Sequence, residues 1–120
     1  MTINTTPVSD PIAIHRGAPK PFSFRQLVNG VYRAFDNTVT CRVSLPNGNT
    51  FDLIVGSGIT LGTWNAVANA LVTIKLTAAQ SRLIPAGTFA GFEVQENVTP
   101  NETIIFMGRL NGVGGDNTGD

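Results

Sequence analysis

The stretch VTCRVSLPNGNTFDLIV, residues 39–55, carries the strongest strand signal in the chain. Its first seven residues alternate between apolar and polar side chains, which is the pattern of a strand with one buried face. Asn47-Gly48 then supplies a hairpin signal, because both residues tolerate a positive φ angle. The stretch therefore predicts two strands, 39–45 and 50–55, joined by a tight turn at 46–49.

Similar patterns continue on both sides of this hairpin. Strand-like segments recur with a turn signal about every ten residues, the last being the turn-rich NVTPNE. A further turn is expected at 62–65, inside an insertion-like stretch, 56–70. These segments predict an all-β fold, a single antiparallel β-sandwich (Ig-like) of about seven strands, with a small barrel or jelly roll as the alternative. The other expected strands are 12–14, 22–24, 71–76, 89–96 and 103–110.

One short helix is expected within this β pattern. Thr77 is a good N-cap residue, and Gln80 three positions later completes a capping box. Pro85 ends the helix, and Gly87 lets the backbone turn into the next strand. A helix this short is not stable alone. We therefore expect a crossover helix near 77–84 that carries the chain between the two sheets, with Leu83 and Ile84 directed inward.

The chain divides into an arm, one domain and a tail. Residues 1–11 are polar, contain two prolines and show no periodicity, which predicts an extended N-terminal arm that takes part in assembly. Residues 12–110 form the expected β-sandwich domain. Residues 111–120, NGVGGDNTGD, are expected to be a Gly-rich flexible tail.

Charge and composition restrict the possible partners. The chain has 120 residues with eight basic and eight acidic side chains, so no overall field recruits nucleic acid. Only 13% of the residues are charged, about half of the usual share of roughly 25%. No signal peptide and no apolar run of membrane-spanning length are found. The sequence therefore predicts neither a nucleic-acid nor a membrane partner, and its weakly charged surface suits a packed assembly.

Catalytic chemistry has little support in the sequence. His15 is the only histidine, which argues against a Ser-His-Asp triad or a two-histidine metal site. Cys41 alternates with apolar neighbours and is expected in the core. Glu93 and Glu96 are three apart on one strand and are expected on opposite faces, unlike a glycosidase pair. The chain is thus predicted not to be an enzyme, with no catalytic, cofactor-binding or metal-binding residues and no cofactor.

Aromatic residues occur in two settings in the sequence, and each setting has two possible roles. Basic and aromatic side chains interleave between residues 16 and 33, as in single-strand nucleic-acid platforms, but the spacing of the aromatics favours packing into the core. Trp64 is expected in a glycine-flanked loop, either as an interface anchor or as a plug at one end of the sandwich. The members of the first group are Arg16, Lys20, Arg25, Arg33, Phe22, Phe24 and Tyr32.

Three segments together resemble a known class of domain. LTAAQSRLIPAGTF, residues 76–89, precedes FEVQ, residues 92–95; HRGAPKPFSF, residues 15–24, would form an opening strand, and residues 102–110, ETIIFMGRL, a closing strand. This arrangement resembles the small Ig-like β-sandwich domains of tailed-phage virion accessory proteins, of the baseplate upper protein or head decoration type. Many of these carry a similar LTxxQTxxLPAGxY signature. The resemblance covers about residues 12–110.

The resemblance implies a structural role. It favours a non-enzymatic virion protein of a tailed bacteriophage, made in the host cytoplasm and placed on the capsid exterior. There it would act as a decoration or cement protein that binds the major capsid protein or other virion proteins and self-associates in a symmetric assembly. A tail, baseplate or fibre-attachment adaptor is the alternative. A carbohydrate- or receptor-binding module is a more distant one, with Trp64 and Tyr32 as its aromatic platform.

Overall fold

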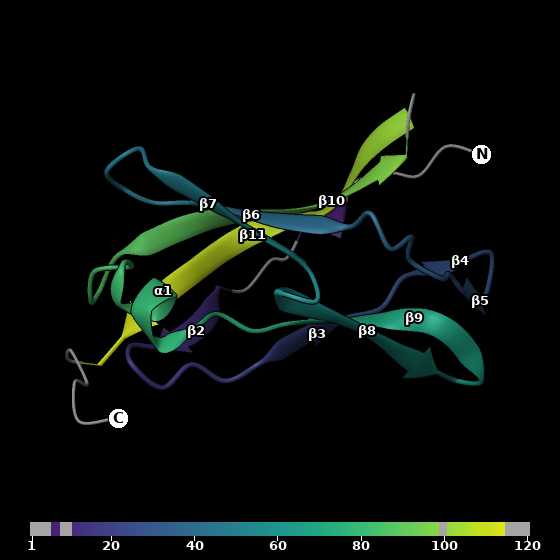
Figure 1. Cartoon of the computed structure of the whole chain (residues 1–120), viewed down its shortest axis with the longest axis horizontal. Coiled ribbons are helices and arrows are strands. Elements are labelled where there is room, and N and C mark those ends of the chain that lie inside the picture. Colours follow the sequence, from purple (N-terminus) through teal and green to yellow (C-terminus); the bar gives the residue numbers. More distant parts are fainter. Residues whose placement is uncertain (1–5, 8–10, 99–100, 115–120) are drawn as a thin grey trace.

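The computed structural model describes residues 6–7, 11–98 and 101–114, and for 6–7, 28, 98 and 101–105 it describes the backbone alone. These residues form eleven strands and one helix (Figure 1). The strands are β1 (Thr6–Pro7), β2 (Ile12–His15), β3 (Phe22–Phe24), β4 (Leu27–Val28), β5 (Val31–Tyr32), β6 (Thr40–Ser44), β7 (Thr50–Val55), β8 (Gly58–Trp64), β9 (Val67–Ile74), β10 (Phe89–Val98) and β11 (Asn101–Val113). The helix is α1 (Ala78–Arg82).

Nine of the described strands make one mixed sheet. Eight follow one another in the order β1-β11-β10-β6-β7-β8-β9-β3, and β2 pairs with β11 beside β1. The strands β4 and β5 form a separate two-stranded ribbon. An all-β fold with one short helix is thereby confirmed. The predicted antiparallel two-sheet sandwich of about seven strands is only partly confirmed, because the described strands form a single curled, half-barrel sheet that includes parallel pairs.

Two sets of hydrogen bonds explain this correction. The strand β7 passes directly to β8 through a short parallel contact, in which Ile54 and Val55 pair with Gly58 and Ile59. The sheet is therefore continuous where a sandwich would divide into two. In addition, β1 and β2 both run parallel to β11, so these two strands lie at one edge of the sheet.

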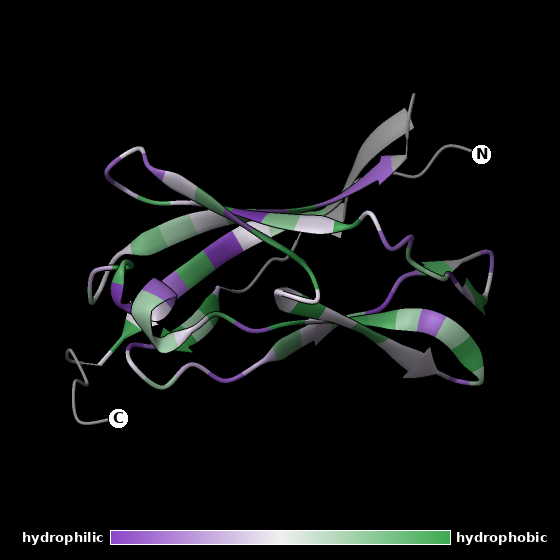
Figure 2. Cartoon of the chain, in the orientation of Figure 1, coloured by the Kyte–Doolittle hydropathy of each residue, from purple (hydrophilic) through white to green (hydrophobic). Residues whose placement is uncertain are grey.

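The curl places the two halves of the sheet face to face around one core. Phe24 on β3 stacks on Phe106 of β11 and Phe92 of β10, with ring centroids 4.8 and 5.8 Å apart. Phe92 is almost completely buried, and full burial of such a side chain contributes about 2–3 kcal/mol. Hydrophobic and hydrophilic residues alternate as bands along β11 (Figure 2). Alternation along the strands thus supplies one apolar face to the inside of the curl.

The hairpin predicted at 39–55 is confirmed, although its turn differs in detail. The strands β6 and β7 pair with Val43 opposite Phe51. Gly48 alone adopts a positive φ, 91°, while the Asn47 side chain accepts a hydrogen bond from the Asn49 N–H at 2.9 Å. The Leu45 carbonyl accepts from the Gly48 N–H at 3.0 Å. Asn47 therefore stabilises the turn through its side chain and not through a left-handed backbone.

The turn predicted at 62–65 is wrong. The strand β8 continues through Gly62 to Trp64, and the chain turns at Asn65-Ala66, whose φ angles are 51° and 65°. Two successive positive φ angles give the turn type that matches the twist of a hairpin. The insertion-like stretch 56–70 is therefore most of a β8–β9 hairpin. Asn29-Gly30 makes a second turn of this kind, between β4 and β5, with φ angles of 53° and 78°.

The expected helix is present and capped as predicted. The Gln80 N–H donates to the Thr77 hydroxyl at 3.1 Å, and the Thr77 N–H donates to the Gln80 side-chain oxygen at 2.9 Å. The helix joins β9 to β10, which lie in opposite halves of the sheet, so it is a crossover. Ile84 is fully buried, whereas Leu83 is 51% exposed, so only one of the two residues expected inside is inside.

The structure describes part of the expected N-terminal arm and part of the expected C-terminal tail. Within the expected arm, Thr6 and Pro7 pair with Phe106 and Met107 of β11, and residues 1–5 and 8–10 lie outside the described residues. The strand β11 continues to Val113. The predicted start of the tail at residue 111 therefore falls inside a strand, and residues 115–120 of the tail lie outside the described residues.

Candidate interaction surface

The β4–β5 ribbon brings aromatic side chains together at one end of the molecule. Leu27 pairs with Tyr32 across the ribbon, and the Tyr32 ring meets the Trp64 ring edge-on, with centroids 6.4 Å apart. The Arg25 guanidinium lies 4.1 Å from the centroid of the Trp64 ring, in cation–π contact. We call this group the aromatic end; its members are Arg25, Leu27, Val31, Tyr32, Trp64 and Asn65.

The aromatic end exposes three large apolar side chains. Leu27 is 56% exposed, Val31 62% and Trp64 37%. Tyr32, Trp64 and Asn65 line a shallow hollow of about 340 Å³. Tryptophan, tyrosine and arginine are the residue types that most often dominate binding energy at protein interfaces. The side chains at this end are therefore suited to docking on another surface, with Trp64 as the central anchor.

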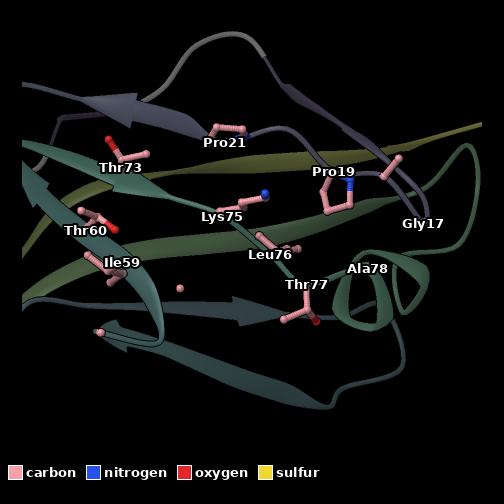
Figure 3. A pocket seen from close by; sticks show the side chains of 13 residues that line it. Gly17, Pro19, Pro21, Ile59, Thr60, Thr73, Lys75, Leu76, Thr77 and Ala78 are labelled. Atoms are coloured by element: carbon pink, nitrogen blue, oxygen red, sulfur yellow. The ribbon is translucent and has the colours of Figure 1, made fainter. Parts of the chain in front are cut away.

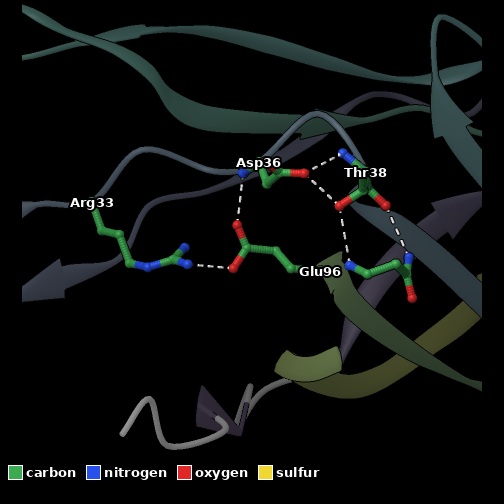
Figure 4. A network of polar contacts seen from close by, with 5 residues as sticks. Arg33, Asp36, Thr38 and Glu96 are labelled. Carbon is green, nitrogen blue, oxygen red and sulfur yellow. Dashed lines mark hydrogen bonds and ion pairs between the residues drawn. The ribbon is translucent and has the colours of Figure 1, made fainter. Parts of the chain in front are cut away.

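A buried ion pair fixes the segment that follows the ribbon (Figure 4). Glu96 on β10 is 3% exposed, and its carboxylate accepts hydrogen bonds from the Arg33 guanidinium and from the Asp36 N–H, the latter at 2.6 Å. The Arg33 N–H donates to the Gln26 carbonyl at 2.8 Å. The same pair thus connects the ribbon to the sheet and sets where Tyr32 stands relative to Trp64.

The network continues on the solvent side of Glu96. The Thr38 hydroxyl and N–H both donate to the Asp36 carboxylate and hold the pKa of that carboxyl below its ordinary value. Asn97 completes the link, because its side chain donates to the Thr38 carbonyl at 2.9 Å. A carboxyl whose pKa falls on folding stabilises the fold above its ordinary pKa, and that contribution is lost as the pH falls through the lowered value.

A second polar cluster lies on the outer face of β6, β7 and β10. Arg42 donates two hydrogen bonds to Asp52, at 2.9 and 3.2 Å. This contact lowers the pKa of the Asp52 carboxyl and raises that of the Arg42 guanidinium. Glu93 lines the same shallow surface. Both partners of the pair are largely exposed, so the cluster is a solvated face with a mutually neutralised pair.

The structure places the residues weighed for catalysis apart from one another. His15 is exposed at the end of β2, while Cys41 is fully buried. Burial raises the pKa of the Cys41 thiol to about 12, so the thiol stays protonated at neutral pH and is a poor nucleophile. Glu96 is buried, and Glu93 lies on the outer face. The prediction that these two carboxylates occupy opposite faces is confirmed.

The basic and aromatic residues between positions 16 and 33 do not share one surface. Phe22 and Phe24 pack against the core, as the sequence favoured. Arg33 is paired with Glu96, and Arg25 covers one face of Trp64. Trp64 itself stands on the last position of β8 and not in a loop, partly exposed and partly packed against its neighbours.

The sequence predicts Tyr32 and Trp64 as an aromatic platform, but it does not predict that Arg25 lies over the Trp64 ring. It also does not predict the exposure of Leu27 and Val31 on the neighbouring ribbon. The signal was Asn29-Gly30 between apolar residues, which is a strong two-residue hairpin motif. It predicts a ribbon that would present its apolar side chains to solvent or to a neighbour.

Comparisons with known proteins assign no function to this chain. Within the described residues, no helix has the length and apolar character needed to cross a membrane, and no group of three or more metal-ligating side chains is found. Comparison with protein-family models, with curated proteins and with solved structures finds no match. The resemblance to phage virion domains therefore stays a hypothesis that rests on the residues quoted for it.

Proposed function

We propose that this chain is a non-enzymatic structural protein of a tailed-phage virion, a decoration protein that binds the major capsid protein on the capsid exterior. Three features support the proposal: the resemblance in residues 76–95, the low share of charged residues, and the docking chemistry of the aromatic end. The Ig-like relationship is part of the proposal. It is supported by the curl, which sets β3 over β10 and β11 as the facing layers of a sandwich would be.

The aromatic end is the observation that carries the proposal. Large apolar side chains project beyond the sheet at Leu27 and Val31, and Trp64 is held between Arg25 and Tyr32. Anchors of this kind bind by burial in a partner's pocket, with no chemical step. One such contact is modest, but many copies placed around capsid symmetry axes bind with high avidity when they also contact one another.

Replacing Trp64 with alanine is expected to weaken particle binding strongly while the domain stays folded. Loss of a central interface tryptophan costs about 2 kcal/mol or more, which is roughly a 30-fold loss of affinity. The matched control is Leu83→Ala, because Leu83 is also an exposed apolar residue, 51% exposed, but lies after α1, away from the aromatic end. Sedimentation of purified protein with undecorated capsids measures both.

Circular dichroism of each variant checks that the fold is kept. Equal binding of Trp64→Ala and the unchanged protein would remove the aromatic end from the docking site. Loss of binding in Leu83→Ala alone would move the interface to the helix side of the molecule.

The hollow beside Trp64 favours one second candidate, a saccharide- or receptor-binding module. Two perpendicular aromatic rings and the Asn65 amide offer apolar faces with a hydrogen-bonding group, which suits a sugar ring. The structure also limits this reading, because Arg25 already covers one face of the indole. Calorimetric binding of a free saccharide that is abolished by Trp64→Ala, together with no binding to capsids, would favour the module over the decoration protein.

A further inference from the structure

A groove of about 800 Å³ lies between the β2–β3 connection, the start of β8 and the segment that joins β9 to α1 (Figure 3). None of its lining residues belongs to the aromatic end, so it is a separate surface. Pro19, Pro21 and Ile59 give it apolar walls, and Thr60 and Thr73 add hydroxyl groups. Its volume falls within the range of about 300–1,000 Å³ that is usual for binding pockets.

Lys75 is the one charged side chain among the lining residues, all of which are described. It is exposed, and its ammonium makes no ion pair and no hydrogen bond with another described residue. No carboxylate of a described residue lines the groove. The groove therefore presents one positive group without a counter-ion, which favours a carboxylate in whatever binds there.

The main chain of Leu76 supplies a second, independent feature of the groove. The Lys75 N–H donates to the Gly58 carbonyl at 2.9 Å, so the main chain of Lys75 faces β8. Main-chain groups of successive residues in an extended segment face opposite sides, so those of Leu76 face away from β8, toward the β2–β3 connection. Leu76 is 1% exposed, and neither its N–H nor its carbonyl has a hydrogen-bond partner among the described residues.

The neighbouring ladder shows why Leu76 is left unpaired. The pairing between β3 and β9 ends at Phe22 and Ile74, and the next pair on that side would include Leu76. Pro19 and Pro21 precede Phe22, and prolines disfavour the continuation of a regular ladder. The connection leaves β9 at this point, and the groove opens beside it. The N–H and carbonyl of Leu76 are thus placed like those of an open sheet edge.

We propose that the groove binds an extended segment of a partner protein that carries one acidic side chain. The main chain of this segment pairs with the N–H and carbonyl of Leu76, as in strand addition to a sheet edge, and its carboxylate meets the Lys75 ammonium. A second copy of this chain fits less well, because a two-fold contact puts the same surface on both sides and would set the two Lys75 side chains together. The inference does not rest on the virion assignment.

Selection from a ribosome-displayed library of random heptapeptides, with the immobilised full chain as the target, tests the proposal without a known partner. We expect the selected peptides to share one aspartate or glutamate between β-forming residues. The affinity of a synthesised selected peptide, measured by fluorescence anisotropy, should fall about fivefold when its acidic residue is replaced by the amide. N-methylation of the peptide nitrogen that faces the Leu76 carbonyl should lower it roughly tenfold.

Variants of the chain locate the bound peptide. Lys75→Gln should weaken binding as much as the change of the peptide's acidic residue does. Lys20→Gln is the matched control, because Lys20 is the other lysine of the chain and does not line the groove. It should leave the affinity unchanged, as should Trp64→Ala. The amide signal of Leu76 in a nitrogen–proton NMR spectrum should shift when the peptide binds.

Four outcomes would overturn the proposal. The first is the selection of no common sequence, and the second is an equal loss of affinity in the two lysine variants. Loss of binding in Trp64→Ala would assign the peptides to the aromatic end and leave the proposed function intact. Selected sequences that match a segment of this chain would assign the groove to the chain itself or to a second copy.

Discussion

Replacing Glu96 with alanine is expected to lower the free energy of unfolding by about 3 kcal/mol, because removal of one partner of a buried ion pair leaves the other charge uncompensated. Arg33 keeps only 21% of its side chain exposed, and the Asp36 N–H loses its acceptor as well. Domains of this size are stable by only about 5–15 kcal/mol. The substitution therefore removes a large share of the total, and urea denaturation followed by circular dichroism measures it.

Two variants make this prediction specific. Asp52→Ala breaks the exposed pair with Arg42, which has good geometry but little burial, and should cost only a small fraction as much. The double replacement Arg33→Met with Glu96→Leu removes both buried charges and should recover most of the stability lost in Glu96→Ala. If Glu96→Ala and Asp52→Ala destabilised the protein equally, the ion pair would not hold the ribbon segment as described.

Replacing Gly112 with alanine is expected to destabilise the protein by about 3 kcal/mol, the upper part of the usual range for overpacking. A Cβ atom at this position would lie 2.6 Å from the Pro85 carbonyl oxygen and 2.8 Å from that of Ile84. Both are backbone atoms that cannot rotate away. Gly112 also holds the loop after α1 through hydrogen bonds to Gly87 and Thr88, at 3.0 and 3.1 Å, so β11 and that loop would be pushed apart.

Gly91 provides the control for this substitution. It lies on the neighbouring strand β10, and a Cβ added there meets no atom within 4 Å. Gly91→Ala should leave the midpoint of urea unfolding nearly unchanged. A similar loss in the two variants would show that strand glycine content, and not the approach of β11 to the loop after α1, limits the stability.

The local features of the fold were predictable because their signals are local. The hairpin at 39–55 follows from alternation and a turn motif, and the capping box at Thr77 and Gln80 follows from four residues. The curl and the parallel pairs were not predictable, since they depend on contacts between β11 and the N-terminal strands about a hundred positions away. The turn after Trp64 was misplaced because Gly62 suggested a turn at 62–65, while Gly62 lies within β8 and Asn65-Ala66 adopts the required conformation.

Some features of the candidate surfaces were predictable from the sequence, and others were not. The sequence identified Tyr32 and Trp64 by residue type, but their contact depends on the ribbon that turns at Asn29-Gly30. The groove lined by Gly17, Pro19 and Lys75 was not predictable, because it forms between segments about 40 residues apart. Neither surface contains a motif with fixed spacing, so only the folded chain brings their residues together.

The abundance of this chain in purified particles of a tailed phage that encodes it tests the central proposal most directly. Quantitative mass spectrometry against the major capsid protein gives the copy number. A decoration protein on the capsid exterior should be present in roughly hundreds of copies per particle. Its ratio to the capsid protein should be fixed, as capsid symmetry requires. About three to twelve copies, the range that follows tail symmetry, would contradict the capsid position, and absence from the particles would contradict the virion role itself.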